Sequence, residues 1–283
     1  MPWRRPRTVV LAGVLSAAVL TSCASSPPAS PTRSAAGTSQ LAGPVAPTRP
    51  IEDLLAAVSP AVLNEVGAGS ASALPTAADG RALTRDGKPL VLYVGAEWCP
   101  FCAAQRWPLS IALARFGQFA NLGEIRSASD DSYPDTASVS FHGARYTSSL
   151  LTFSGVELQS NELVNGRRAP LDTLTGEDQQ IFKTFDAPPW VEPNQAATVP
   201  FIAAGGRYLI TQHMYDPSLL AGKTADQIAT AVSDPSTPIA RGIDGAANVI
   251  TAALCTLTAG QPGAVCTRTG VQAASKSLPP APS

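Results

Sequence analysis

The hydrophobic pattern is strongest in the apolar run from Leu90 to Val94, which shows no alternation and is rich in β-branched and aromatic residues. Such a run is typical of a central strand covered on both faces. Gly95 ends it, and Pro100 lies where the first turn of a helix favours proline, because the missing N–H has no partner there. The chain from Cys102 to Phe119 is predicted to be helical, since apolar residues recur on one face: Ala104, Trp107, Ile111 and Ala114. The pattern predicts a strand, a turn and a helix in succession.

Periodicity elsewhere predicts further helices and strands. A turn is predicted at Asp86-Gly87, just before the central strand. Thr175 is a predicted N-cap, with acidic residues in the turn that follows it. The predicted helices are Ile51–Val58, Thr175–Phe185, Thr224–Val232 and Ile239–Leu257. The predicted strands are Ala61–Ala68, Leu122–Ser127 as the next parallel strand of a β-α-β unit, and several between Ala137 and Leu158.

Two cysteines separated by two residues, Cys99 and Cys102, stand at the start of the predicted helix. Cys99 would lie at the helix N-terminus, where unpaired N–H groups and the helix dipole stabilise a thiolate. Cys102 would lie one turn further on the same side, close enough to form a disulfide. Such positions lower a cysteine pKa from about 8.5 to roughly 3.5–7.5. The spacing therefore predicts that Cys99 is the attacking sulfur of disulfide exchange and Cys102 the resolving one.

The same spacing is also half of a zinc site. No second Cys-x-x-Cys or histidine pair completes it, because the remaining cysteines and histidines are scattered: Cys23, Cys255, Cys266, His142 and His213. Redox chemistry is therefore favoured over zinc binding, and neither a metal nor a cofactor is expected.

The residues around this motif resemble a known family. Ala96-Glu97-Trp98-Cys99 followed by Cys102 is similar to the thioredoxin active-site signature, and Pro100-Phe101 is similar to the dipeptide of glutaredoxins. The wider pattern from Tyr93 to Trp107, together with Cys255 and Cys266, resembles more closely the thioredoxin-like family catalogued as domain of unknown function 929. That resemblance covers roughly Val58 to Cys266.

The resemblance implies an α/β, thioredoxin-like fold with a central mixed sheet flanked by helices. Thr198-Val199-Pro200 resembles the loop whose proline is cis and faces the two cysteines. Pro200 would then shape the substrate groove, and the Val199 backbone would pair with an extended substrate. The groove around the exposed sulfur would be framed by Trp98, Pro100 and Phe101.

Two departures from thioredoxin change the expectations. The stretch between the motif helix and Pro200 is far longer than in a minimal thioredoxin fold, which implies an insertion at about 129–193. It would either select substrates beside the groove or be structural padding. Tyr93 stands where thioredoxins have a buried carboxylate that helps to move protons, and tyrosine, with a reference pKa near 10, is a poor base at neutral pH. A water or another side chain would have to replace that carboxylate.

The N-terminus is typical of a bacterial lipoprotein signal. Arg4, Arg5 and Arg7 form a positive region, and the apolar stretch Val9–Leu20 is too short to favour a permanent transmembrane helix. Leu20-Thr21-Ser22-Cys23 resembles the lipobox, whose cysteine becomes the acylated N-terminus of the mature protein. The alternative is a plain secretory signal with an incidental cysteine.

This signal predicts how the rest of the chain is organised. Residues 1–23 would be the signal peptide, 24–50 a disordered tether, 51–266 the folded domain and 267–283 a disordered tail. Disulfides persist outside the cytoplasm, and five cysteines less the lipidated Cys23 leave four, an even number. The expected pairs are Cys99 with Cys102, and Cys255 with Cys266 as a structural disulfide that stabilises by roughly 3 kcal/mol at most.

Composition narrows the function further. The net charge of -1 gives no electrostatic surface for a nucleic acid. We expect an oxidoreductase anchored by lipid on the extracytoplasmic side of the cell membrane. It would act on protein thiols and disulfides and exchange electrons with an unidentified membrane or envelope partner. The rival is a non-catalytic lipoprotein of the same fold that serves as a binding module. A buried, unreactive Cys99 would favour this rival.

Overall fold

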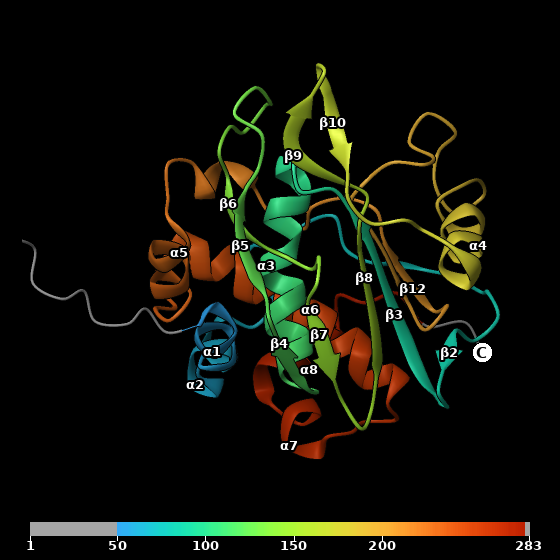
Figure 1. The fold of residues 1–283 in the computed structure, drawn as a ribbon. Coiled ribbons are helices and arrows are strands. Elements are labelled where there is room, and N and C mark those ends of the chain that lie inside the picture. Colours follow the sequence, from blue (N-terminus) through green and yellow to red (C-terminus); the bar gives the residue numbers. More distant parts are fainter. Residues whose placement is uncertain (1–49, 281–283) are drawn as a thin grey trace, which may run out of the picture. The chain divides into compact units, whose positions relative to one another are not determined.

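The computed structural model describes residues 50–280 of the chain. Its central feature is a mixed sheet in the order β1-β12-β11-β3-β2, in which β8 also pairs with β3 (Figure 1). β8 runs parallel to β3, whereas β2 and β11 run antiparallel to it. These strands are β1 (Thr76–Ala77), β2 (Thr84–Arg85), β3 (Lys88–Gly95), β8 (Thr152–Glu157), β11 (Phe201–Ala204) and β12 (Tyr208–Ile210).

β3 occupies the middle of the sheet because its side chains are apolar on both faces. Residues 90–94 are each 0% exposed. Alternate side chains enter two separate core clusters, Val91 and Tyr93 on one face and Leu92 on the other. The predicted central strand is therefore confirmed, and the predicted turn before it joins β2 to β3, with positive φ at Asp86 and Gly87.

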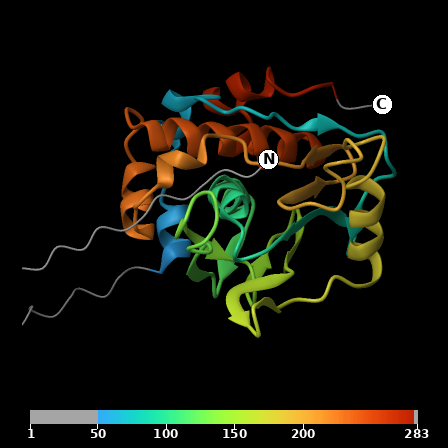
Figure 2. The same ribbon diagram turned by 90° about the horizontal axis from the view of Figure 1, so that it is seen from above.

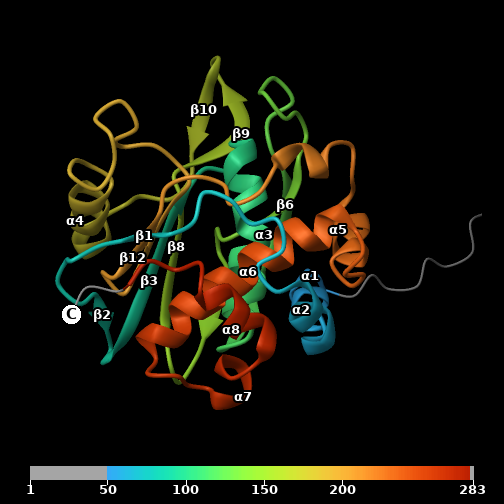
Figure 3. The same cartoon turned by 180° about the vertical axis from the view of Figure 1, so that it is seen from behind.

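Helices cover both faces of the sheet (Figures 2 and 3). α3 (Pro100–Ala114) and α6 (Pro238–Leu257) pack together on one face, and α4 (Gly176–Phe185) covers the other. The fold is therefore α/β with a central mixed sheet flanked by helices, as expected. The remaining helices are α1 (Ile51–Ala56), α2 (Pro60–Val66), the short 3-10 helix η1 (Pro217–Leu220), α5 (Ala225–Ala231), α7 (Gly263–Cys266) and α8 (Thr269–Ser275).

Three antiparallel pairs of strands lie outside the central sheet. They are β4 (Gln118–Ala120) with β7 (Arg145–Thr147), β5 (Gly123–Arg126) with β6 (Ala137–Ser140), and β9 (Gln159–Val164) with β10 (Arg167–Pro170). The hairpin of β9 and β10 is tied to the cysteine motif at its base, because the N–H of Glu97 donates to the carbonyl of Gln159 at 2.8 Å.

One predicted strand is wrong, and a second is confirmed as a strand but has a different partner from the predicted one. Residues 61–68 fall largely in helix α2, where Ser59 is the N-cap and its Oγ accepts the N–H of Val62 at 3.2 Å. Residues 122–127 include β5, but β5 pairs antiparallel with β6 instead of joining the central sheet. The parallel partner of β3 is β8, much later in the chain.

The ends of two predicted segments also differ from the structure. The motif helix stops at Ala114 rather than Phe119, and Phe119 lies in β4. The chain turns at Gly117, where a side chain would come within 2.4 Å of a backbone oxygen of Thr147. Within the predicted disordered tail, α8 is folded and buries Val271 and Ala274. The four helices predicted from their spacing are confirmed as α1, α4, α5 and α6.

The predicted insertion at about 129–193 is not one added block. Its middle part supplies β8, a strand of the central sheet. The parts that lie outside that sheet are the strands β6 and β7, the hairpin of β9 and β10, and helix α4, whose N-cap is Thr175 as predicted.

The predicted signal segment 1–23, with Cys23, and the tether up to residue 49 lie outside the described residues. Within residues 50–280, no helix has the length and apolar character needed to span a bilayer.

Asn248→Ala is expected to destabilise the fold by about 2–3 kcal/mol, because each buried group left without a partner costs about 1–3 kcal/mol. Asn248 is fully buried on α6, and its Nδ2 donates to the carbonyls of Leu63 and Gly67 at 2.7 and 2.8 Å. Urea unfolding measures the loss. Thr256→Ala on the same helix removes only a local bond to Ala252 and is the control, and equal losses in both variants would contradict the prediction.

Candidate functional site

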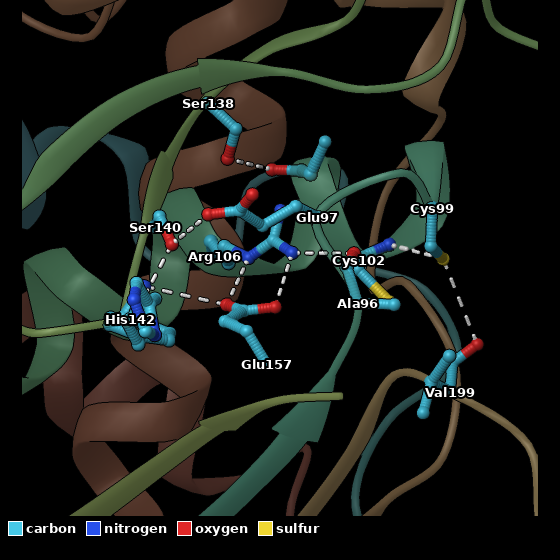
Figure 4. A network of polar contacts seen from close by, with 12 residues as sticks. Ala96, Glu97, Cys99, Cys102, Arg106, Ser138, Ser140, His142, Glu157 and Val199 are labelled. Carbon is cyan, nitrogen blue, oxygen red and sulfur yellow. Dashed lines mark hydrogen bonds and ion pairs between the residues drawn. The ribbon is translucent and has the colours of Figure 1, made fainter. Parts of the chain in front are cut away.

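Cys99 is the N-cap residue of α3, as predicted, because Pro100 starts the helix. Its Sγ accepts the backbone N–H of Cys102 at 3.1 Å, and its thiol donates to the carbonyl of Val199 at 3.9 Å (Figure 4). The pKa of Cys99 is lowered by the hydrogen bond from the Cys102 thiol, and further by the Cys102 N–H and the charge of Arg106, which together outweigh burial. Cys99 is therefore the more acidic thiol of the pair.

Cys102 lies one turn further along α3 and is 0% exposed. Burial raises its pKa well above the ordinary value, and the hydrogen bond to Cys99 adds to the increase. Both side chains are free thiols, so the structure shows the reduced pair and not the predicted disulfide. The two thiols thus differ in acidity in the direction that disulfide exchange requires, with an acidic attacking sulfur and a protonated resolving sulfur.

The sequence predicts an exposed Cys99 sulfur, but in the structure Cys99 is buried. Only 3% of the residue is accessible, because Trp98, Phe101 and Val199 pack against the pair of cysteines. A substrate can reach this sulfur only if these side chains move or are displaced.

A buried ion pair beside the cysteines was not anticipated from the sequence. Arg106 on α3 and Glu157 at the end of β8 both have fully buried side chains. Nε and Nη2 of Arg106 donate to the two carboxylate oxygens at 2.8 and 2.7 Å, and Nη2 also donates to the carbonyl of Ala96 at 2.7 Å (Figure 4). Burial raises the pKa of Glu157, and the charge of Arg106 opposes the increase. The available signal was the position of Arg106 four residues after Cys102, on the same helical face.

Tyr93 lies in β3 beneath the motif and is 0% exposed. Burial raises its pKa well above 10, so it is no base at neutral pH, in agreement with the sequence-based expectation. The guanidinium carbon of Arg106 lies 5.9 Å from the centre of its ring. A buried carboxylate is nevertheless present at this site, because Glu157 supplies one from β8 instead of β3.

Aromatic side chains form a rim around Cys99. Nε1 of Trp98 donates to Oε1 of Gln159 at 3.0 Å, which connects the motif to β9. The ring of Phe101 stacks on His213 with centres 4.9 Å apart and meets Tyr133 edge-on at 5.7 Å. Burial lowers the pKa of His213, which favours its neutral form. The structure therefore brings the predicted groove residues together and adds three that were not predicted.

The Val199–Pro200 peptide bond is cis, as the resemblance implies. Asp186, directly after α4, forms hydrogen bonds with the loop that precedes the Val199–Pro200 bond. Its Oδ2 accepts the N–H of Thr198 at 2.8 Å, and its carbonyl accepts the N–H of Ala197 at 3.1 Å. Burial raises the pKa of Asp186 to about 6, although these N–H groups favour the charged form. These two bonds fix the residues directly before Val199, whose carbonyl accepts the Cys99 thiol.

Asp186→Ala is expected to speed alkylation of Cys99 by iodoacetamide about tenfold, because a lost hydrogen bond to a charged group corresponds to about 1.5 kcal/mol or more. The freed loop would uncover the sulfur. Asp186→Asn keeps an oxygen acceptor for the Thr198 N–H and should react at nearly the wild-type rate. Mass spectrometry of the alkylated peptide gives both rates. Equal rates in wild type and Asp186→Ala would show that the loop does not control access.

The second predicted disulfide is formed. Cys255 and Cys266 are bonded and join the end of α6 to α7. Among residues 50–280 there is no cluster of three or more histidine, cysteine, aspartate or glutamate side chains that could hold a metal ion. The proposed lipidation site, Cys23, lies outside the described part of the chain.

Comparison with known proteins identifies the family. The chain matches the model of the family described as Domain of unknown function (DUF929) over residues 75–256, and it belongs to that family. No curated protein and no solved structure matches it. The matched region includes the two motif cysteines, Arg106, Glu157 and Pro200, whereas Cys266 lies beyond its end.

Proposed function

We propose that this member of the DUF929 family is a thiol–disulfide oxidoreductase that works outside the cytoplasm, held at the membrane by a lipid on Cys23. The observation that carries the proposal is the position of Cys99 as the N-cap of α3, where its Sγ accepts the N–H of the fully buried Cys102 at 3.1 Å. The pKa of Cys99 is lowered at the start of α3, whereas that of Cys102 is raised. A reactive cysteine needs thiolate character, and a helix N-terminus is a position that supplies it.

The proposed reaction has two steps. The Cys99 thiolate attacks one sulfur of a substrate disulfide, which forms a mixed disulfide and releases the first substrate thiolate. Cys102 then loses its proton and attacks the Cys99 sulfur, which closes the Cys99–Cys102 disulfide and releases the second substrate thiolate. Two electrons pass from the protein to the substrate, and the reverse sequence oxidises a substrate dithiol. A dithiol or disulfide partner in the envelope would reset the pair.

The extracytoplasmic location is supported by the signal-like residues 1–23 and by the Cys255–Cys266 disulfide, since disulfides persist in oxidising compartments. Mass spectrometry of membrane fractions should find diacylglycerol on Cys23, and Cys23→Ser should release the protein from the membrane. A wild-type chain without the lipid would overturn the anchor and leave the redox proposal standing.

One observation favours the rival function, a binding lipoprotein with inert cysteines. Cys99 is buried, whereas Leu163 and Val164 on the hairpin of β9 and β10 are 56% and 55% exposed. Successive strand residues point to opposite faces, so each side of the hairpin tip carries one exposed apolar side chain that a partner could cover. This hairpin would then bind a partner without any redox step.

Catalysis of disulfide reduction separates the two functions. The full-length chain in detergent would be mixed with a disulfide-bonded protein substrate and excess glutathione, and substrate thiols would be followed over time. We expect the wild type to exceed the Cys99→Ala/Cys102→Ala double variant by at least about tenfold, because only the wild type offers a thiolate of lowered pKa. Equal rates would favour the binding lipoprotein.

A further inference from the structure

Two buried hydrogen-bond donors beside the cysteine pair have no acceptor among the described residues. They are Nη1 of Arg106 and the hydroxyl of Tyr93. The hydroxyl occupies the space above Gly95, where a Cβ would lie only 2.0 Å from it. Unpaired buried donors are rare in native proteins, and a site with two of them is suited to an anion that forms there.

Cys102 becomes anionic during disulfide exchange, and it interacts electrostatically with both Arg106 and Tyr93. Arg106 follows it by one turn on the same face of α3. Ala96 contacts both residues, because its carbonyl accepts Nη2 of Arg106 at 2.7 Å (Figure 4) and its backbone forms a hydrogen bond with Cys102. The positive charge of Arg106 lowers the pKa of Cys102 against the effect of burial.

We propose that Arg106 is a positioning residue whose charge, balanced by Glu157, stabilises the Cys102 thiolate in the second step of exchange. The inference rests on the proposed function. In this step Cys102 gives its proton to the solvent and its sulfur attacks Cys99 of the mixed disulfide. The bond between Cys99 and the substrate sulfur breaks, and the leaving thiolate keeps the electron pair. Nη1 of Arg106 and the Tyr93 hydroxyl have no acceptor among residues 50–280, and the Cys102 thiolate supplies a negative charge that interacts with both side chains.

The two members of the ion pair act on Cys102 with opposite sign. The positive Arg106 favours the thiolate, whereas the negative Glu157 weakens that effect while it keeps the guanidinium fixed. Removal of the negative charge should therefore help the second step, and removal of the positive charge should slow it. Other titratable groups that face the pair stay unchanged in this comparison: Cys99, Tyr93, Glu97, Asp172, whose Oδ2 accepts the Glu157 N–H at 2.9 Å, and His142, which pairs with Asp172.

Ellman's reagent separates the two steps, because attack by Cys99 releases the first coloured thiolate and attack by Cys102 releases the second. Stopped-flow traces would be recorded from pH 5 to 10 on the reduced full-length chain. The variants are Glu157→Gln, Arg106→Met and the charge-conserving Arg106→Lys. The Cys99→Ala/Cys102→Ala double variant corrects for the other cysteines.

We expect Arg106→Met to slow the second phase about tenfold at pH 7 and to shift its pH profile upward by about one unit, since one pKa unit is a factor of ten. Glu157→Gln should shift the profile downward, and Arg106→Lys should restore much of the wild-type rate. A structural role alone predicts that both charge-removing variants change the second phase in the same direction, and that result would overturn the inference. If Arg106→Met does not fold, the pH profile of the second phase in Glu157→Gln tests the inference by itself. A shift to lower pH supports it, and a shift to higher pH overturns it. A missing first phase in the wild type would refute the proposed function itself.

Discussion

Replacing Cys99 by alanine is expected to abolish disulfide exchange, with a loss of about a hundredfold or more, because the attacking thiolate is then absent. Replacing Cys102 by alanine should have a different result. Cys99 would still attack, but no sulfur would resolve the mixed disulfide, so covalent complexes with substrates should accumulate. Non-reducing electrophoresis followed by mass spectrometry detects these complexes and identifies the joined cysteines.

The double variant Cys255→Ala/Cys266→Ala is the matched control for this result. Loss of the Cys255–Cys266 disulfide should lower the free energy of unfolding by roughly 3 kcal/mol at most, the value for a short closed loop. Exchange through Cys99 should persist in this variant. Exchange that survives without Cys99, or that disappears with the Cys255–Cys266 pair, would place the chemistry elsewhere in the molecule.

Asp244→Asn is expected to stabilise the fold by about 3 kcal/mol at pH 8. Asp244 lies on α6 with 0% exposure, and neither of its carboxylate oxygens has a partner among the described residues. Burial raises its pKa to about 8, and the charge of Arg115 only partly opposes this. A rise of about four units in the pKa of Asp244 corresponds to about 6 kcal/mol lost from the free energy of unfolding. In the variant, the unpaired buried amide of Asn costs about 1–3 kcal/mol, which reduces the net gain.

The sign of the pH dependence follows from the same shift. The folded protein keeps a proton on Asp244 that the unfolded chain releases near pH 4, so this contribution is fully present below about pH 4 and is lost as the pH rises to about 8. Urea unfolding at pH 5 and pH 8 should show a decrease in wild type that is much smaller in Asp244→Asn. The exposed Glu162→Gln is the control and should behave as wild type. Parallel pH dependences in wild type and Asp244→Asn would contradict the prediction.

Local sequence patterns were sufficient for β3 and α3, and thereby for the position of the two cysteines. A strand of apolar residues must be covered on both faces, and a proline after Cys99 defines where the helix begins. The helices α4, α5 and α6 were predicted for the same reason, because each has its own periodicity or cap.

Features that depend on distant parts of the chain were not predictable. Four strands that pair outside the central sheet, β4 to β7, separate β8 from β3 along the chain, and nothing local distinguishes β5 from a parallel neighbour. Arg106 and Glu157 resemble ordinary surface charges until the fold buries them together. The resemblance placed Val199 and Pro200 beside the cysteines, but it gave no sign that Trp98, Phe101 and Val199 would close over Cys99 and leave it only 3% exposed.

The reduction potential of the Cys99–Cys102 pair tests the central claim most directly. The full-length chain would be equilibrated in glutathione buffers of stepped ratio, alkylated, and analysed by mass spectrometry, with Cys99→Ala as the control. We predict a reversible two-electron transition between about -120 and -270 mV, the range from strong disulfide donors to thioredoxin. A Cys99–Cys102 pair that never exchanges with glutathione at any ratio would contradict the account and leave the binding lipoprotein in its place.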